Sequence, residues 1–247
     1  MAQTSKIEWT EASWNPVTGC SKISAGCKYC YAERLARRLQ KMGQRRYRNG
    51  LEVTLHPDLI NAPLKWKRPR RIFVNSMSDL FHEKIPDKFI ESVFETMRLA
   101  HWHTFQILTK RASRMAELAP RLHWPENVWM GVTVESQREL HRMRELQKMP
   151  SAVRFVSMEP LLSPISDFPI ENIDWIIVGG ESGPKARAME KSWVIEIRNR
   201  CMAYGIPFFF KQWGGVNKKK NGSLLDGKYH YEYPNLCRGV WQYAPTR

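Results

Sequence analysis

Apolar, strand-like segments alternate with amphipathic, helix-like segments along most of the chain, and this alternation constrains the fold more than any other feature of the sequence. The strand-like segments are 71–76, 104–110, 127–135, 153–159, 174–180 and 207–213, and 14–17 is a candidate first strand. Helical periodicity marks 86–101, 112–122, 136–149 and 192–205 between them. Buried strands joined through helices form parallel sheets. We therefore predict an α/β fold, a partial or complete βα (TIM-like) barrel with parallel strands.

The C-terminal part of the chain has a different pattern. KKKNG at 218–222 is predicted to be a surface turn, and GSLLDGKYHYEY after it is predicted to be a small hairpin that turns at Asp226-Gly227. The sequence has neither an internal repeat nor a low-complexity linker. We therefore predict one barrel domain at 1–215 and a C-terminal hairpin appendix at 216–247.

The composition excludes several classes of protein. At 43% apolar residues the chain can bury a large core, so it is not a disordered protein. It has no run of about 18 apolar residues, and its N-terminus lacks the apolar segment of a signal peptide. We therefore expect a cytoplasmic protein with no membrane partner. Five cysteines in 247 residues are too few for a disulfide scaffold, and clustered cysteines in a reducing compartment favour metal binding.

Three of the five cysteines, Cys20, Cys27 and Cys30, lie within one short segment with the spacing C-x6-C-x2-C. Thiolates are soft ligands that suit zinc or iron–sulfur clusters. The C-x2-C pair allows two sulfur atoms to approach one centre, and Gly19 and Gly26 allow tight turns of the backbone. The segment is therefore a candidate metal site.

The number of nearby ligands favours a cluster over zinc. A structural zinc site normally has a fourth Cys or His. The first histidine in the sequence is His56, Cys201 falls within a predicted helix, and Cys237 lies near the C-terminus. A cubane cluster held by three cysteines leaves one iron open to another ligand. We predict a [4Fe–4S] cluster and keep structural zinc and unligated thiols as alternatives.

Polar residues follow the predicted strands, at the points where βα barrels place their chemistry. Acidic residues occur at four of the strand ends, which helix capping and solubility alone do not easily explain. Ser136 is also a plausible helix cap. The polar strand-end residues include Asn75, Ser76, Ser78, Asp79, Thr109, Lys110, Thr133, Glu135, Ser136, Ser157, Glu159, Gly179, Gly180, Glu181, Ser182, Lys211 and Gln212.

The cysteine motif resembles that of the radical S-adenosylmethionine (SAM) superfamily, whose usual spacing is C-x3-C-x2-C with an aromatic residue before the last cysteine. Cys27, Tyr29 and Cys30 match this pattern, whereas the six-residue gap after Cys20 departs from it. The longer signature W-N-P-V-T-G-C…G-C-x-x-C-Y-A-E also resembles a phage-associated family of unassigned function, the three-Cys-motif proteins, over nearly the full length.

The superfamily resemblance implies roles in binding SAM. Tyr29 would lie against the adenine, and the segment 75–79 would replace the usual turn that holds the SAM ammonium group. Lys110 would pair with the SAM carboxylate. The Gly179-Gly180 turn would permit close approach by adenine or substrate. The ribose contacts would come from Thr133, Glu135 and Ser136; the complete implied cofactor set is Tyr29, Asn75, Ser76, Ser78, Asp79, Lys110, Thr133, Glu135, Ser136, Glu159, Gly179 and Gly180.

The resemblance also implies an activity, the reductive cleavage of SAM at the cluster to give a 5′-deoxyadenosyl radical. Such an enzyme requires an electron donor, such as a reductase or a flavodoxin-like protein. The segment Leu108-Thr109-Lys110 resembles a short segment of spore photoproduct lyase, a DNA-repair member of the superfamily.

A net charge of +15 favours a polyanionic partner, and we predict nucleic acid or a nucleotide. Two basic groups, at 34–48 and 65–71, are predicted to border the barrel mouth, where Tyr47, Trp66, Trp124 and Trp213 could stack on bases. The alternative is a solvated helix face and core tryptophans. Two other functions stay open: a radical SAM enzyme acting on a peptide or small molecule, and a zinc-stabilised nucleic-acid-binding protein without catalysis.

Overall fold

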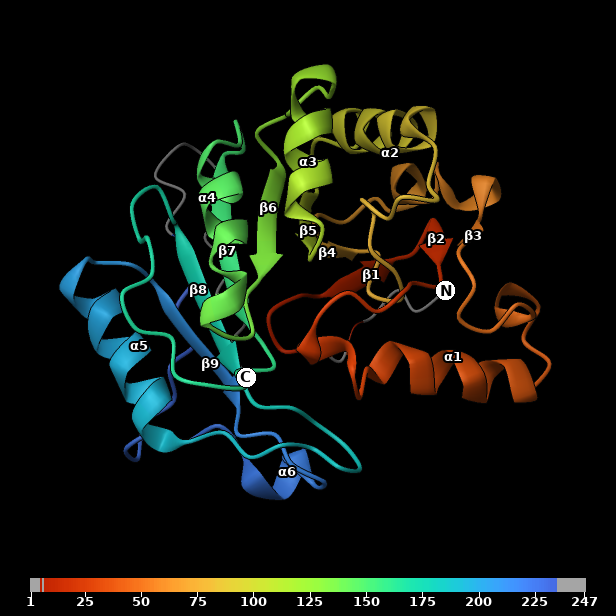
Figure 1. Cartoon of the computed structure of the whole chain (residues 1–247). Coiled ribbons are helices and arrows are strands. Elements are labelled where there is room, and N and C mark those ends of the chain that lie inside the picture. The colour runs from red at the N-terminus through yellow and green to blue at the C-terminus, as the bar shows by residue number, and fades with distance from the viewer. Residues whose placement is uncertain (1–4, 6, 235–247) are drawn as a thin grey trace.

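The computed structural model describes residues 5 and 7–234, and its centre is a curled sheet of seven parallel strands (Figure 1). Along the sheet the strands are β1 (Ala12–Trp14), β4 (Arg71–Val74), β5 (Thr104–Thr109), β6 (Val128–Thr133), β7 (Val153–Met158), β8 (Trp175–Gly179) and β9 (Phe208–Gln212). Within this sheet each strand pairs with the one that follows it in this order, and β1 and β9 form the two edges. The predicted α/β fold is confirmed as a partial barrel.

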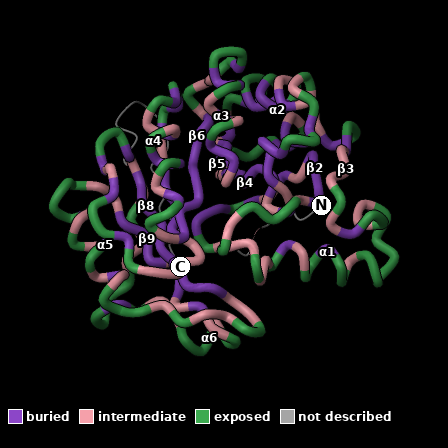
Figure 2. The backbone as a smooth tube through the Cα atoms, in the orientation of Figure 1, coloured by how far each residue is buried: buried purple, intermediate pink, exposed green. Residues whose placement is uncertain are grey.

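Helices connect these strands and cover the outer face of the sheet (Figure 1). The connecting helices are α2 (Asp87–Leu99), α3 (Ala112–Leu118), α4 (His141–Gln147) and α5 (Lys191–Ala203). Their apolar faces pack on the strands in one large core. The helix α1 (Tyr31–Lys41) lies apart from this layer, and Figure 2 shows that much of its surface is exposed while the strands are buried. None of the described helices is long and apolar enough to cross a membrane.

The inner face of the sheet has an aromatic floor. Trp9 lies across it, with ring centroids 4.8 Å from Phe73 and 6.0 Å from Phe155. Trp175 packs on the same group, 5.8 Å from Phe155 and 5.9 Å from Phe209. These residues form a core that is separate from the helix-facing one.

Strand alternation places polar residues directly above this floor. Every second residue of a strand faces the same side, so Asn75 follows Phe73 and Ser157 follows Phe155. Lys211 follows Phe209 in the same way, beyond the aromatic layer. The carboxyl ends of the strands therefore combine an apolar floor with a polar wall.

The first strand differs from the prediction of 14–17. It covers Ala12–Trp14 and pairs in register with β4. Pro16 lacks an N–H group and cannot continue the ladder. The chain then forms β2 (Val17–Thr18), which pairs antiparallel with β3 (Thr54–Leu55) in a separate two-stranded sheet.

The predicted turn at Asp226-Gly227 is confirmed. Both residues have positive φ angles, 51° and 75°, and Leu225 and Lys228 exchange backbone hydrogen bonds of 3.0 and 3.1 Å around them. Tyr231 then forms an antiparallel bridge with Phe209 at the edge of the large sheet. The segment predicted as a surface turn contains the short helix α6 (Lys218–Asn221). The division of the chain at 215 stays a prediction, and its last part, 235–247, lies outside the described residues.

Candidate functional site

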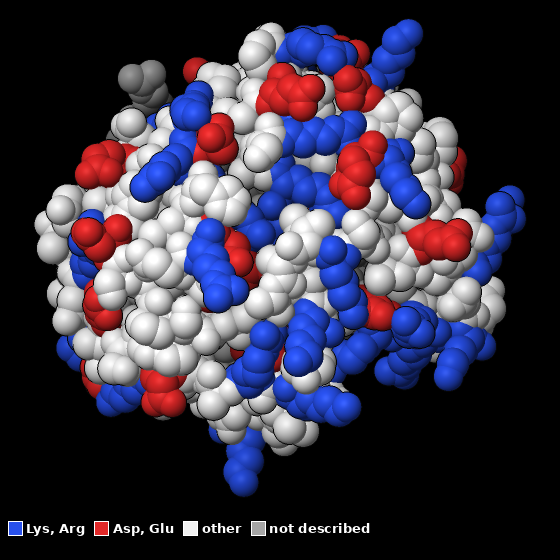
Figure 3. All heavy atoms as spheres, viewed as in Figure 1, with Lys and Arg blue, Asp and Glu red and all other residues white. Residues whose placement is uncertain are grey.

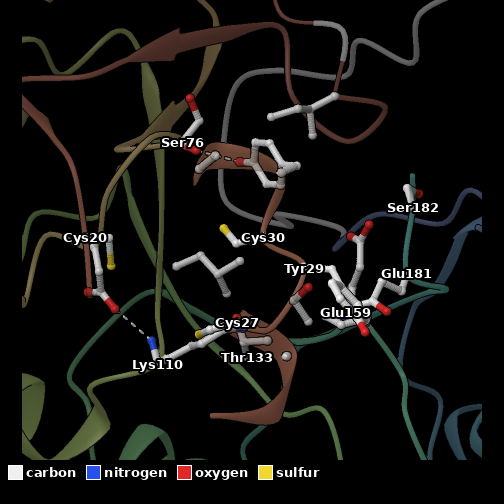
Figure 4. Close-up of a pocket in the computed structure, with 18 of the residues that line it drawn as sticks. Cys20, Cys27, Tyr29, Cys30, Ser76, Lys110, Thr133, Glu159, Glu181 and Ser182 are labelled. Carbon is white, nitrogen blue, oxygen red and sulfur yellow. Dashed lines mark hydrogen bonds between the residues drawn. The ribbon is translucent and has the colours of Figure 1, made fainter. Parts of the chain in front are cut away.

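A cavity of about 540 Å³ opens at the carboxyl ends of the strands (Figure 4). Its volume is within the range of small-molecule and cofactor sites. Its walls come from the cysteine segment, from the strand ends and from the loop after β8. The predicted site residues that line it are Cys20, Cys27, Tyr29, Cys30, Asn75, Ser76, Ser78, Asp79, Lys110, Thr133, Glu159 and Gly180.

All three clustered cysteines line this cavity with free thiols. Cys20 follows β2, Cys27 ends a 3₁₀ turn, and Cys30 is the residue before the first turn of α1. In Figure 4, Cys20 lies at the left of the view, Cys27 and Cys30 lie near its centre, and Tyr29 and Glu159 lie to their right. The fold therefore brings one loop of thiols to the strand ends.

The two predicted turn glycines have different roles. Gly19 has a φ angle of +87°, and a Cβ atom there would lie 2.1 Å from the carbonyl oxygen of Glu52. Gly26 lacks a positive φ angle, but a Cβ atom on it would lie 2.4 Å from Oε1 of Glu135. Gly19 therefore forms a turn, whereas Gly26 lets the cysteine loop lie directly on a buried carboxylate.

Each of the four strand-end acids has a cationic partner. The pairs are Asp79–Arg111 at 3.1 Å, Glu135–Lys110 at 3.1 Å, Glu135–Arg142 at 2.8 Å, Glu159–Lys211 at 2.8 Å and Glu181–Arg187 at 2.6 Å. These carboxylates therefore neutralise and position cations around the cavity. Ion pairing accounts for the presence of an acid at each of these strand ends.

Glu135 is fully buried and does not belong to the cavity wall. It accepts a hydrogen bond from Ser24 Oγ in the cysteine loop and pairs with Lys110 and Arg142. Burial raises the pKa of this carboxyl, but the two cations and the Ser24 hydroxyl outweigh burial and hold the pKa below its usual range. Glu135 thus joins the cysteine loop to the end of β6 outside the cavity. Its carboxylate is already bonded to Ser24, Lys110 and Arg142.

Arg111 is a site residue that sequence reasoning missed. It pairs with Asp79 at 3.1 Å and with Glu83 at 2.8 Å. It also donates to the backbone oxygen of Ser21 at 3.2 Å and to Sγ of Cys20 at 3.6 Å. The available signal was its position directly after the predicted strand that ends at Lys110.

Arg187 was also missed, and it borders the predicted adenine residue. Its guanidinium lies 5.5 Å from the ring centroid of Tyr29 and donates to the carbonyl of Ala25 at 2.9 Å. Glu181 holds it with bonds from Nε and Nη2. Burial raises the pKa of Glu181, but the hydrogen bonds and charge of Arg187 bring it below its usual range. Arg187 therefore links the cysteine loop, which carries Tyr29, to the loop after β8.

Two further predicted residues, Ser136 and Gly179, also lie outside the cavity wall. Ser136 caps a 3₁₀ turn, as its predicted capping role requires. A Cβ atom on Gly179 would lie 3.2 Å from Cδ of Glu159, and one on Gly180 would lie 2.1 Å from the carbonyl oxygen of Trp213. In the described structure the glycine pair therefore allows close packing within the chain, against Glu159 and Trp213.

The second predicted basic group does not border the cavity. Residues 65–71 lead into the amino end of β4, whereas the cavity lies at the carboxyl ends of the strands, and none of them lines it. Trp66 is buried, and Trp124 packs on Phe94 with ring centroids 5.0 Å apart. The prediction that both basic groups and these tryptophans face the mouth is wrong.

The donors around the cavity fit a cluster and an organic cofactor. Within 5 and 7–234, no three His, Cys, Asp or Glu side chains are grouped so as to hold one metal ion. A cluster has several irons, so its cysteine ligands need not converge on one point. Nδ2 of Asn75 and Oε1 of Gln212 are buried beside the cavity without a hydrogen-bond partner among the described residues. These atoms could bind a polar ligand.

Two solved structures show similarity to the chain. "Spore photoproduct lyase complexed with dinucleoside spore photoproduct" is 13% identical with a TM-score of 0.49, and the match covers 80% of this chain and 62% of that one. A mutant of spore photoproduct lyase with bound AdoMet and dinucleoside spore photoproduct is 12% identical with a TM-score of 0.44, over 76% of this chain and 60% of that one. The chain thus spans less than two thirds of either structure.

No curated protein matches the sequence. A family model described as "Protein of unknown function (DUF5131)" matches residues 4–234, which is most of the chain. On this match, the chain belongs to the DUF5131 family.

Proposed function

We propose that the chain is a radical SAM enzyme that holds a [4Fe–4S] cluster on Cys20, Cys27 and Cys30 and binds SAM in the adjoining cavity. One observation carries this proposal. Three free thiols from a single loop line a cofactor-sized cavity at the carboxyl ends of the strands of a partial βα barrel. This is the end of such a sheet at which catalytic groups collect.

Several polar groups of the cavity wall could hold SAM. Asn75 has a free Nδ2 donor, and its Oδ1 is fixed by the backbone N–H of Val17. The hydroxyls of Thr133 and Ser157 also line the cavity, and no hydrogen bond to either is present in the described part of the chain. Tyr29 offers an aromatic ring for the adenine. Lys110 could reach the SAM carboxylate only by sharing its ammonium group with Glu135.

When bound, the cluster would supply one electron for cleavage of a carbon–sulfur bond of SAM, giving a 5′-deoxyadenosyl radical that abstracts hydrogen from a substrate. The chain's own task is to position the reactants and exclude water. The aromatic floor closes one end of the cavity, and the ion pairs around its wall hold the flanking loops. A flavodoxin-like protein or a reductase would be the electron donor.

The metal content tests the first part of the proposal. Protein prepared anaerobically with iron and sulfide is expected to contain four iron and four labile sulfide atoms per chain, as the composition of the proposed cluster requires. Replacing Cys20, Cys27 or Cys30 with Ala should abolish the cluster. Cys201→Ala is the matched control, because Cys201 is buried in the core at α5. Stoichiometric zinc without labile sulfide would instead support a zinc-stabilised protein.

SAM binding tests the second part. Asn75→Asp keeps the acceptor for Val17 and tolerates the positive φ angle of 60° at this position, but it removes the Nδ2 donor. This variant should bind SAM more weakly in calorimetric titration while its iron content stays at the wild-type level. Equal SAM affinity in both proteins would exclude Asn75 from the cofactor site. Formation of 5′-deoxyadenosine by the reduced protein would establish the reaction.

The substrate class proposed here is nucleic acid. The net charge of +15 supports it, because phosphate neutralisation by Lys and Arg drives such binding. The distribution of this charge around the cavity indicates how a strand would be held.

A further inference from the structure

Four basic residues of α1 form one stripe that begins at the cavity. Arg34, Arg37, Arg38 and Lys41 are spaced at i, i+3, i+4 and i+7, which places them on one face of the helix. Ala32 and Ala36 are buried on the opposite side. The four residues and Met42 line a shallow, open crevice on the surface. We call these four basic residues the α1 stripe.

The α1 stripe is continuous with the candidate active site. Arg34 lines both the crevice and the cavity. Its Nη2 donates to the carbonyl of Ser182 at 2.9 Å, which fixes it at the mouth against the loop after β8. Figure 3 shows Lys and Arg gathered over α1 at the lower right of the view. An anionic ligand could therefore follow the stripe into the cavity without crossing an acidic surface on the helix.

The charge of the α1 stripe is largely uncompensated. Arg37 pairs with Glu33 at 2.8 Å, but Arg38 and Lys41 have no acidic partner in the described chain. Of the other cations that line the cavity, Lys110, Arg111, Lys211 and Lys218 each form an ion pair, the last with Glu8 at 3.2 Å. Among the described residues, Arg34 of the α1 stripe is therefore the one cavity-lining cation without an ion pair.

An aromatic residue stands where the α1 stripe meets the cavity. Tyr31 lines the cavity and is 50% exposed, although its hydroxyl is held by the carbonyl of Ser76. Single-strand binding sites combine a basic groove that follows the backbone with aromatic rings on which bases stack. Arg34 and Tyr31 provide both elements at neighbouring positions on the helix.

We infer that the α1 stripe binds the phosphates of a single-stranded nucleic acid and leads one of its nucleotides to the cavity; the substrate role of that nucleotide rests on the proposed function. The stripe runs over eight residues, from Arg34 to Lys41, or about 10 Å of helix. This length is enough to face only a few phosphates of one strand. A single row of cations along one face of a helix suits one strand better than two.

Matched double substitutions test this inference. Arg38→Gln with Lys41→Gln removes two unpaired charges from the α1 stripe. Lys67→Gln with Arg68→Gln removes the same charge from two exposed residues near the amino end of β4. Fluorescence anisotropy would report the affinity of the full-length proteins for labelled DNA and RNA of about 16 nucleotides, single- and double-stranded, across a range of salt concentrations. Iron is determined in the same samples, so that binding is scored independently of the cluster.

The expected result is salt-dependent binding that favours single strands. The slope of log affinity against log salt should become shallower by about 2 in the α1 variant and should be unchanged in the control. Equal effects of both variants would show that only bulk charge matters and would overturn the inference. Preference for duplex, absence of salt-dependent binding, or binding only to vesicles of phosphatidylserine and phosphatidylcholine would also overturn it. Salt-dependent binding of single strands by protein that takes up no iron on anaerobic reconstitution would support the stripe and contradict the proposed radical chemistry.

Discussion

Arg111 donates a hydrogen bond from Nη1 to Sγ of Cys20 over 3.6 Å, and the same nitrogen lies 3.1 Å from Oδ2 of Asp79. The pKa of the Cys20 thiol is raised to about 11, first by burial and then by the nearby Asp79, while Arg111 opposes both effects. Arg111 is therefore the cation through which β5 positions a predicted cluster ligand. Its contact with Cys20 makes it a positioning residue for that ligand.

The first prediction concerns the reduction potential of the cluster. Arg111→Gln should make the potential more negative, because loss of a cation destabilises the more negative reduced state. Iron retained per chain should also fall. Arg111→Lys keeps the charge and should recover part of the potential, although it loses the two-pronged contact with Ser21. Potentiometric titration and iron analysis measure both effects.

Arg121→Gln is the control for Arg111, because Arg121 is more exposed and pairs with Asp87 and Glu91 on the surface. It should leave the potential and iron content at wild-type values. If Arg111→Gln also left both unchanged, the contact with Cys20 would have no role in holding or tuning the cluster.

A second prediction concerns the buried carboxylate behind the cysteine loop. Glu135→Gln leaves Lys110 and Arg142 without their counter-charge, and breaking a buried pair in this way costs about 3–5 kcal/mol of unfolding free energy. Urea unfolding of metal-free protein measures the loss. Glu126→Gln changes an exposed carboxylate and should stay within about 0.5 kcal/mol of wild type. A loss of similar size in both variants would contradict the assigned role of Glu135.

The pH dependence of stability follows from the same carboxylates. The pKa values of Glu135 and Glu181 are lower in the folded protein than the ordinary value of 4.5. The unfolded chain therefore takes up protons first as the pH falls, so these groups stabilise the fold above pH 4.5 and lose this contribution as the pH drops through their folded pKa values. Unfolding free energy measured from pH 7 downward should decline below about pH 5. The decline should be shallower in Glu135→Gln.

The strands and the cysteine loop could be predicted because their signals are local. Apolar runs such as 174–180 are short, bounded and separated by helical periodicity, and the spacing of the three thiols is visible without a structure. The position of Pro16 also explains, in retrospect, why the first strand ends at Trp14. Local patterns were sufficient for the other strands of the large sheet and for the polar residues beyond their ends, but not for the pairing of β2 with β3.

The pairing of side chains could not be predicted in the same way. Glu135 meets Arg142 from a helix and Lys110 from the preceding strand end, and these contacts depend on tertiary packing. From the sequence the acids were therefore predicted to be available for cofactor binding, whereas in the fold they are in ion pairs. The wrong placement of 65–71 could have been avoided from the sequence alone, because a segment that precedes a parallel strand enters the sheet at the end opposite to the catalytic loops.

The final prediction tests how closely the cysteine loop packs on Glu135. A Cβ atom on Gly26 would lie 2.4 Å from Oε1 and 2.5 Å from Cγ of that residue, so Gly26→Ala must displace either the loop or the carboxylate. Iron retention and the unfolding free energy of metal-free protein should both fall. Glu135→Ala removes the atoms that the new methyl group meets, so the double variant should lose less stability than the sum of the two single variants. Strictly additive losses would show that the cost of Gly26→Ala arises from the loop itself and not from its contact with Glu135.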